Sequence, residues 1–197
     1  MASGSTKVNE ILNILSDQLT QGWLFYFTAK HISHAFEDKR INSSIYFFIA
    51  SYNACLNETI LAMSKLLIEH SDSISFYTLL KYAENNPNVF IFDRAKDVKI
   101  RVKEHKKKLD SYNQLINSIR EQRDRKIAHL DKKHINQPSK ILAMKPVDMI
   151  KVEECYQDIH QIINVYYKYA LDSELYLENI EEDVEDDINF ILTQINQ

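Results

Sequence analysis

Apolar residues recur every three or four positions along most of the chain, which is the spacing that places them on one face of an α-helix. The first such stripe predicts a helix over residues 6–38 and comprises Val8, Ile11, Leu12, Leu15, Leu19, Trp23, Tyr26 and Phe27. A turn predicted around residues 40–44 separates it from a second helix, which we expect to be the most buried element. The second stripe comprises Ile45, Phe48, Ile49, Tyr52, Leu56, Ile60, Met63 and Leu67.

Polar breaks divide the remainder of the chain into further elements. Ser71, Asp72 and Ser73 interrupt the apolar pattern and offer an N-cap for a short third helix that ends near Glu84. The other predicted elements are a long basic helix over residues 93–131, a proline-containing loop over 134–146, and helices over 148–178 and 179–195.

The scarcity of glycine and proline narrows the fold class. The 197 residues contain two glycines and three prolines, which is fewer than the turns of an all-β or doubly wound α/β fold require. Because 45% of the residues are hydrophobic, the chain can fill a core. We predict an all-α protein, an antiparallel bundle of about five helices that forms a single domain over residues 1–197.

Cysteine content and the N-terminal sequence indicate where the protein works. Cys55 and Cys155 are too few for a disulfide scaffold, which favours a reducing compartment, and we interpret both as small buried apolar residues. The N-terminal sequence MASGSTKVNE contains no apolar leader. No apolar run approaches the roughly 20 residues of a membrane span. We expect a soluble cytoplasmic protein with no membrane partner.

Charge is segregated along the chain, although the net charge is only -4. Residues 94–133 are strongly basic, whereas residues 178–187 are strongly acidic. The two surfaces can face each other within one chain or across a dimer, or the basic face can remain solvated and unpaired. In the last case, the face from Arg94 to Lys108 offers a track for the backbone of RNA.

Most sequence signatures of enzymes are absent. The chain has no glycine-rich phosphate loop, no zinc-protease motif and no pair of closely spaced cysteines. His31 and His34 lie three residues apart, but no third metal ligand lies near them in the sequence. We therefore expect no metal site and no cofactor.

The segment from Arg120 to His134, REQRDRKIAHLDKKH, concentrates cations at the end of the predicted basic helix. At about 100° per residue, Arg123 lies about 40° from Ile119 and so continues the apolar stripe. A buried guanidinium must find an anion, because arginine does not deprotonate. The anion can be a carboxylate or a phosphate. In the first case the segment is a charged helix end, in which Arg123 pairs with Asp124, Asp131 or a distant glutamate.

In the second case, the segment holds the groups needed to cleave RNA without a metal. A guanidinium can stabilise the extra negative charge of a pentacoordinate phosphorus. An imidazole with a pKa of about 6.5 can transfer protons at neutral pH. His129 supplies the imidazole, whereas in the first case it is a cation near a helix C-terminus.

These residues resemble a known family. Arg123, Asp124 and His129 match the R-polar-x-H signature of the higher eukaryotes and prokaryotes nucleotide-binding (HEPN) superfamily, with five residues between the arginine and the histidine. The string RDRKIAHLDKK, Trp23 and the sequence of residues 58–84 are similar to the abortive-infection subgroup, the AbiU-like proteins. The resemblance thus extends over most of the chain.

The resemblance implies a homodimer in which two copies of the motif face each other and form one composite site. In many HEPN proteins this site is a metal-independent endoribonuclease, in which the RNA 2′-hydroxyl attacks the adjacent phosphate. Carried over to this sequence, Arg123 holds the scissile phosphate, His129 acts as general base or acid, and Asp124 orients one of them. The cations expected to bind the RNA around them are Arg120, Arg125, Lys126, Lys132 and Lys133.

Three further features of the motif bear on this transfer. Arg123 and His129 diverge by about 120° on one α-helix, which favours pairing between two chains. Asp131 stands where some HEPN toxins carry a tyrosine that a partner enzyme modifies, so we do not expect that mode of control. Arg125 shares the face of His129 and is the second candidate for the arginine.

Three functional hypotheses follow. The leading one is an RNA-cleaving toxin or phage-defence effector, controlled by an antitoxin or a companion defence protein. The second is a catalytically inactive HEPN module that binds protein or nucleotide in such a system. The third is a helical scaffold in which residues 120–134 are only a charged helix end.

Overall fold

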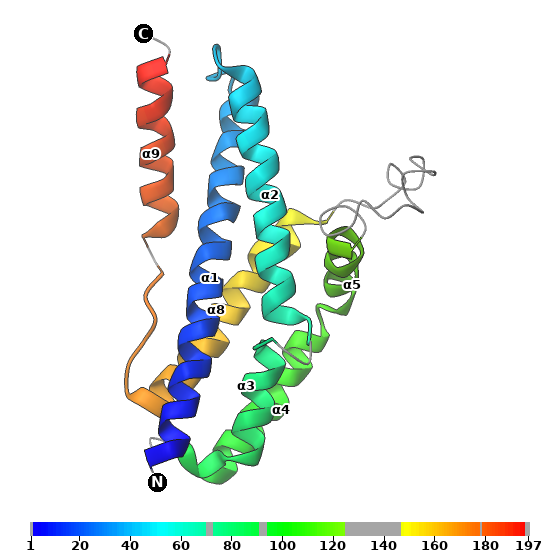
Figure 1. Cartoon of the computed structure of the whole chain (residues 1–197), viewed down its shortest axis with the longest axis vertical. Helices are drawn as coiled ribbons and strands as arrows, with labels where there is room; N and C mark the ends of the chain where they lie inside the picture. The colour runs from blue at the N-terminus through cyan, green and yellow to red at the C-terminus, as the bar shows by residue number, and fades with distance from the viewer. Residues whose placement is uncertain (1, 70–72, 91–93, 125–146, 178, 196–197) are drawn as a thin grey trace. The chain divides into compact units, whose positions relative to one another are not determined.

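The computed structural model describes residues 2–69, 73–90, 94–124, 147–177 and 179–195, and all regular secondary structure within these ranges is helical (Figure 1). The prediction of an all-α fold is confirmed. The helices are α1 (Ala2–Glu37), α2 (Ile45–Leu67), α3 (Phe76–Asn85), the 3₁₀ turn η1 (Pro87–Val89), α4 (Ala95–Asp110), α5 (Asn113–Gln122), α8 (Met149–Leu171) and α9 (Ile180–Ile195).

The chain divides into two compact units. The first unit consists of Met1–Leu19 and Met63–Leu175, and the second of Thr20–Ala62 and Tyr176–Gln197. Helices α1 and α2 therefore contribute residues to both units. The expectation of a single domain over residues 1–197 stays a prediction.

The core of the first unit is built around aromatic residues of α8. Tyr156 and Tyr166 are fully buried, and the ring of Phe90 meets that of Tyr166 edge to face at a centroid distance of 5.7 Å. The hydroxyl of Tyr167 donates to Ser16 Oγ at 2.9 Å and so ties α8 to the first half of α1. Full burial of one large apolar side chain contributes about 1.5–3 kcal/mol, so this aromatic cluster is a main source of the unit's stability.

The long basic helix predicted over residues 93–131 is wrong, because the chain breaks after Asp110 and starts α5 at Asn113 (Figure 1). Ser111 Oγ donates to the carbonyl of Lys108 at 2.6 Å, and Tyr112 leaves the helical region with φ -91° and ψ 11°. The buried Tyr112 then donates its hydroxyl to Asp158 of α8. This tertiary contact redirects the chain, although the apolar stripe continues across the break.

Helix α3 begins later than predicted. Its N-cap is Ser75, not one of the residues from Ser71 to Ser73. The backbone N–H of Ser75 donates to Thr78 Oγ1 at 3.2 Å, which satisfies a donor at the start of the helix. The predicted end near Glu84 is confirmed within one residue, because α3 ends at Asn85.

Helix α8 ends at Leu171, seven residues before the predicted end at residue 178. Asp172 adopts the left-handed conformation, with φ 51° and ψ 41°, and this stops the helix. The following irregular segment turns back, because the N–H of Leu175 donates to Asn164 Oδ1 at 2.7 Å and the Leu175 carbonyl lies 2.7 Å from His160 Nε2. Side chains of α8 thus replace the hydrogen bonds that a longer helix would make.

The second unit joins the later part of α1 to α9. Lys30 Nζ lies 2.9 Å from Glu181 Oε1, and Arg40 Nη1 donates to Asn189 Oδ1 at 2.6 Å. One acidic residue at the start of α9, Glu181, therefore has a partner on α1. On the apolar side, α9 buries Val184, Ile188 and Leu192.

The prediction that residues 45–67 form the most buried element is wrong for the first turns of α2. Tyr46 is 89% exposed and Phe47 is 62% exposed. Ile45, Tyr46 and Phe47 are consecutive, and successive residues of an α-helix point about 100° apart. One buried face therefore cannot accommodate all three.

Candidate functional site

The sequence motif enters the structure at the end of α5. Arg123 follows the last residue of α5 with helical dihedrals, φ -56° and ψ -51°. At Arg123 and Asp124 the turns widen to π-helical spacing, a local feature that is frequent at functional sites. Ile119, one turn earlier, is fully buried, and the side chain of Arg123 is only 17% exposed. The prediction that Arg123 continues the apolar stripe is confirmed.

Asp124 provides an anion for Arg123. Both Nε and Nη2 of Arg123 approach Asp124 Oδ1, at 2.7 Å and 2.6 Å. The Asp124 side chain is 48% exposed. A pair that is partly exposed contributes only about 0–1 kcal/mol to stability. In the structure, the pair directs the guanidinium of Arg123 toward Asp124.

Arg120 lies one turn before Arg123 and is exposed. Its Nη1 lies 3.4 Å from the amide oxygen of Asn117. An amide carries no net charge, so within the described part of the chain no ion pair compensates the positive charge of Arg120. The end of α5 thus presents an exposed guanidinium next to one that is oriented by a carboxylate.

The other predicted site residues lie outside the described residues, in the range 125–146. They are His129, Arg125, Lys126, Lys132 and Lys133, together with Asp131 and the predicted loop over 134–146. The calculated divergence of about 120° between Arg123 and His129 presumes a uniform α-helix. Because the turn at Arg123 and Asp124 is wider than an α-helical turn, the calculated angle does not apply to this segment.

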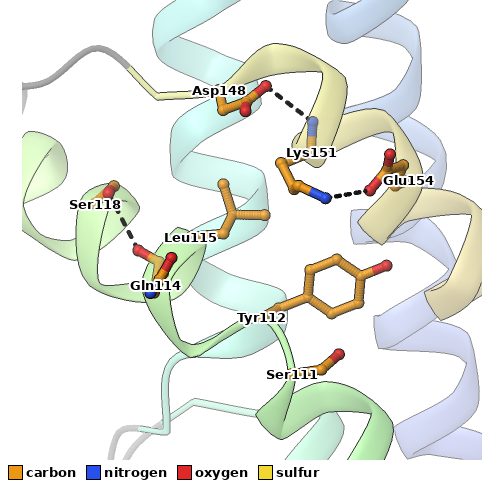
Figure 2. A pocket seen from close by; sticks show the side chains of 8 residues that line it. All are labelled: Ser111, Tyr112, Gln114, Leu115, Ser118, Asp148, Lys151 and Glu154. Carbon is orange, nitrogen blue, oxygen red and sulfur yellow. Dashed lines mark hydrogen bonds and ion pairs between the residues drawn. The ribbon is translucent and has the colours of Figure 1, made fainter.

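A pocket lies between α5 and the first turns of α8, within the first unit (Figure 2). Its volume is about 550 Å³, and it is lined by Ser111, Tyr112, Gln114, Leu115, Ser118, Asp148, Lys151 and Glu154. The break between α4 and α5 places Ser111 and Tyr112 in its wall. Sequence analysis missed the pocket. The available signal was the recurrence of small or polar residues at 111, 114 and 118, which share one side of a helix.

The charges of the pocket do not suit a phosphate. Asp148 caps α8 by accepting from the backbone N–H groups of Ile150 and Lys151, at 3.1 Å and 3.2 Å. Lys151 Nζ pairs with Glu154 Oε2 at 2.9 Å. The pocket lining thus contains two carboxylates and one ammonium that is already paired, and this charge would repel a phosphodiester. Arg120, which makes no ion pair with any described residue, is better placed to meet a phosphate.

Comparison with known families decides which class of protein carries this motif. The family model described as AbiU2, a HEPN family, matches residues 5–191. The chain belongs to the AbiU2 family of HEPN proteins. The AbiU2 match includes the positions of Arg123, Asp124 and His129, and it confirms the resemblance drawn from the sequence. The protein is therefore an abortive-infection-related HEPN module. No curated protein and no solved structure matches the chain significantly.

Three cations on α4 of this AbiU2 chain have local partners. Lys106 Nζ lies 2.6 Å from Glu84 Oε2, and Lys108 Nζ lies 3.0 Å from Asp158 Oδ2. Arg101 pairs with Glu104 on the same helix at 3.2 Å. These partners belong to α3, α8 and α4, not to the acidic residues of α9.

His31 and His34, which lie three residues apart in the sequence, contact each other and an acidic residue of α9. The rings of His31 and His34 meet edge to face at 6.0 Å, and His31 Nε2 lies 4.0 Å from Glu181 Oε1. Burial lowers the pKa of His31, an effect opposed by Glu185 and Glu181. Within the described ranges, no three histidine, cysteine or acidic side chains cluster as metal ligands.

The two cysteines differ in burial. Cys155 is fully buried, as predicted, whereas Cys55 is half-buried. Burial raises the pKa of both thiols.

None of the helices whose residues are described has a stretch apolar and long enough to cross a bilayer.

Proposed function

We propose that this AbiU2 protein is a metal-independent endoribonuclease that acts as a toxin or phage-defence effector. The observation that carries the proposal is the orientation of Arg123 by Asp124, at distances of 2.6 Å and 2.7 Å, beside the exposed Arg120. A fixed guanidinium can stabilise charge that develops on a phosphate in the transition state without reorganising. Family membership supports the assignment of His129 as its partner.

The proposed reaction takes place in a homodimer. His129 of one copy removes the proton from the RNA 2′-hydroxyl, and the 2′-oxygen forms a bond to the adjacent phosphorus. The bond from phosphorus to the 5′-oxygen breaks, and the leaving oxygen takes up a proton from the imidazolium form of His129. The products are a 2′,3′-cyclic phosphate and a 5′-hydroxyl, so that no metal and no external oxidant are needed. Arg123 stabilises the negative charge of the pentacoordinate phosphorus, and Asp124 is a positioning residue.

The cations near the motif bind the RNA in this proposal. Arg120 is the member of this group that lies within the described residues, and it makes no ion pair with any of them. Arg125, Lys126, Lys132 and Lys133 are assigned the same role by their positions in the sequence. A companion protein or antitoxin is proposed to restrain the activity in the cell.

A second candidate function is supported by the same ion pair. If Asp124 only neutralises Arg123, the pair is a structural feature of a helix end and the protein is an inactive HEPN module. Such a module would bind a protein or a nucleotide in a defence system. The two functions differ in whether RNA is cut.

The deciding experiment is an RNA cleavage assay with purified protein, mixed RNA and excess chelator. Arg123→Ala should reduce the rate about 10²–10³-fold, and His129→Ala should reduce it about 10²–10⁴-fold. Arg40→Ala is the matched control, because it removes an arginine that pairs with an acidic residue, Asp38, outside α4 and α5. A dimeric wild type that leaves all RNA intact supports the inactive module. Cleavage that survives both site substitutions contradicts the residue assignment.

A further inference from the structure

Helix α4 carries two kinds of cation. Lys106, Lys108 and Arg101 are paired with acidic residues, as described above. A second set is exposed and makes no ion pair with any described residue. We call this set the lysine stripe, and it consists of Lys96, Lys99, Lys103 and Lys107.

The lysine stripe is a continuous surface feature. Its members are separated by steps of three or four residues, so their side chains leave the helix within a sector of about 80°. At 1.5 Å per residue the stripe extends over about 16 Å. Val98, Val102 and Leu109, on the opposite side of α4, are at most 1% exposed. The core thus holds the helix in an orientation that points the lysines into solvent.

We propose that the lysine stripe binds the sugar-phosphate backbone of RNA and delivers it to the site at the end of α5. This inference rests on the proposed ribonuclease function and extends it to substrate binding. The stripe and Arg123 belong to the same compact unit, in which α5 follows α4 after the break. One strand of a nucleic-acid duplex carries a negative charge about every 3.4 Å along the axis. A row of about 16 Å therefore spans enough phosphates for all four ammonium groups.

The composition of the stripe favours a nucleic-acid backbone over other anionic surfaces. A membrane-binding helix inserts its apolar face, but the apolar face of α4 is already buried in the unit. Lysines are flexible point charges and carry no pattern for reading bases, so the contact should be independent of RNA sequence. Because the chain has a net charge of -4, attraction to RNA must come from a local surface of this kind.

Salt dependence of binding tests the proposal directly. The probe is a short single-stranded RNA with 2′-O-methyl groups, which lacks the nucleophilic hydroxyl and cannot be cut by the proposed reaction. The test variant replaces Lys96, Lys99, Lys103 and Lys107 together with glutamine. The matched control replaces the exposed residues Lys39, Lys65, Lys81 and Lys168 with glutamine, which gives the same change in net charge.

Each phosphate contact in a single strand contributes about 0.7 to the slope of log K against log salt. Loss of four contacts should therefore reduce the slope by about 2.8 in the test variant, whereas the control variant should retain most of it. Replacement of the four lysines by arginine should preserve binding, which separates loss of charge from misfolding. Equal effects in the test and control variants, or an unchanged slope in the test variant, would overturn the proposal.

Two further outcomes separate this inference from the ribonuclease proposal. In the first outcome, wild type binds the probe with a salt slope that depends on the lysine stripe and yet cuts no RNA. That result supports the RNA-binding surface and contradicts the catalytic function. If wild type cuts RNA and the test variant cuts it with the same salt dependence, the result supports the catalytic function and contradicts the RNA-binding surface. Equally strong stripe-dependent binding to polyglutamate would assign the surface to acidic proteins and overturn its assignment to RNA.

Discussion

The hydroxyl of Tyr112 donates to the carboxylate of Asp158 at the point where α4 ends and α5 begins. Lys108 reaches the same carboxylate at 3.0 Å. Burial, together with the hydrogen bond to Asp158, raises the pKa of Tyr112, so the phenol remains a donor at any physiological pH. One side chain of α8 thus holds both helix ends in place.

The contact at Asp158 should contribute measurably to stability. Tyr112→Phe removes one hydrogen bond and should cost about 0.5–1.5 kcal/mol, whereas Asp158→Ala leaves a buried hydroxyl unpaired and should cost about 1–3 kcal/mol. Tyr176→Phe is the control, because Tyr176 is 72% exposed. Urea unfolding measures all three variants. Similar costs for Tyr112→Phe and Tyr176→Phe would show that the contact does not stabilise the break.

Stability should fall below about pH 6.5, partly because of His105. Burial lowers the pKa of His105 from its usual value of 6.5, and its Nδ1 lies 3.1 Å from Tyr166 Oη. The unfolded state then binds a proton at a higher pH than the folded state. Stability is full above the unfolded pKa and is lost as the pH falls through the folded pKa.

Urea unfolding between pH 5 and 8 tests the contribution of His105. His105→Gln should flatten the pH dependence, and exposed His34 provides the control substitution His34→Gln. Some dependence should remain in His105→Gln, since burial also lowers the pKa of His31. An undiminished slope in His105→Gln would rule out this role.

The two thiols should react at different rates. Cys155 is fully buried and burial raises its pKa, whereas Cys55 is half-buried. Since the thiolate is the reactive form, a maleimide should label folded protein at Cys55 alone and unfolded protein at both positions. Mass spectrometry of labelled peptides identifies the site. Rapid labelling of Cys155 in the native protein would show that α8 opens.

A composite site makes a specific prediction for mixed variants. Arg123→Ala and His129→Ala should each be inactive as homodimers. When the subunits are exchanged, each mixed dimer regains one intact pair if the arginine of one copy works with the histidine of the other. Mixing should then restore roughly a quarter of the wild-type rate, because about half of the dimers are mixed and each has one of two pairs. No recovery in verified mixed dimers would place both residues of a pair in one chain.

Asp124 should act through Arg123 rather than on RNA. Asp124→Ala leaves the guanidinium without its partner at 2.6 Å and should reduce kcat by up to about 10²-fold, as expected for a misplaced catalytic group. KM should change little, and Asp124→Glu should recover part of the loss. A change confined to KM would instead indicate that Asp124 affects substrate binding.

The local physics of the sequence predicted the helices well, but not the break after Asp110 or the end of α8 at Leu171. The apolar stripes around Leu15, Val102 and Ile159 are buried as expected, because helical periodicity is a property of neighbouring residues. The break at Tyr112 depends on Asp158, and the end of α8 depends on contacts between Asn164 and Leu175. Contacts between residues distant in the sequence leave no periodic signal.

The candidate site was likewise predicted only in part from the sequence. The position of Arg123 on the apolar stripe predicted that it needs an anion, and the structure provides Asp124, one of the carboxylates considered. The wider turn at these residues has no signal in the apolar pattern, which would fit either helical spacing. The pocket beside α5 was missed because it depends on the break at Ser111 and Tyr112.

The division of the chain into units fixes the order in which they are completed on the ribosome. Translation adds about 5–20 residues per second, so Thr20–Ala62 emerges several seconds or more before Tyr176–Gln197, its complement in the second unit. During that interval the apolar side chains of Trp23 and Phe27 lack the helix that completes their unit. These side chains therefore wait for α9 while Met63–Leu175, the larger part of the first unit, is synthesised.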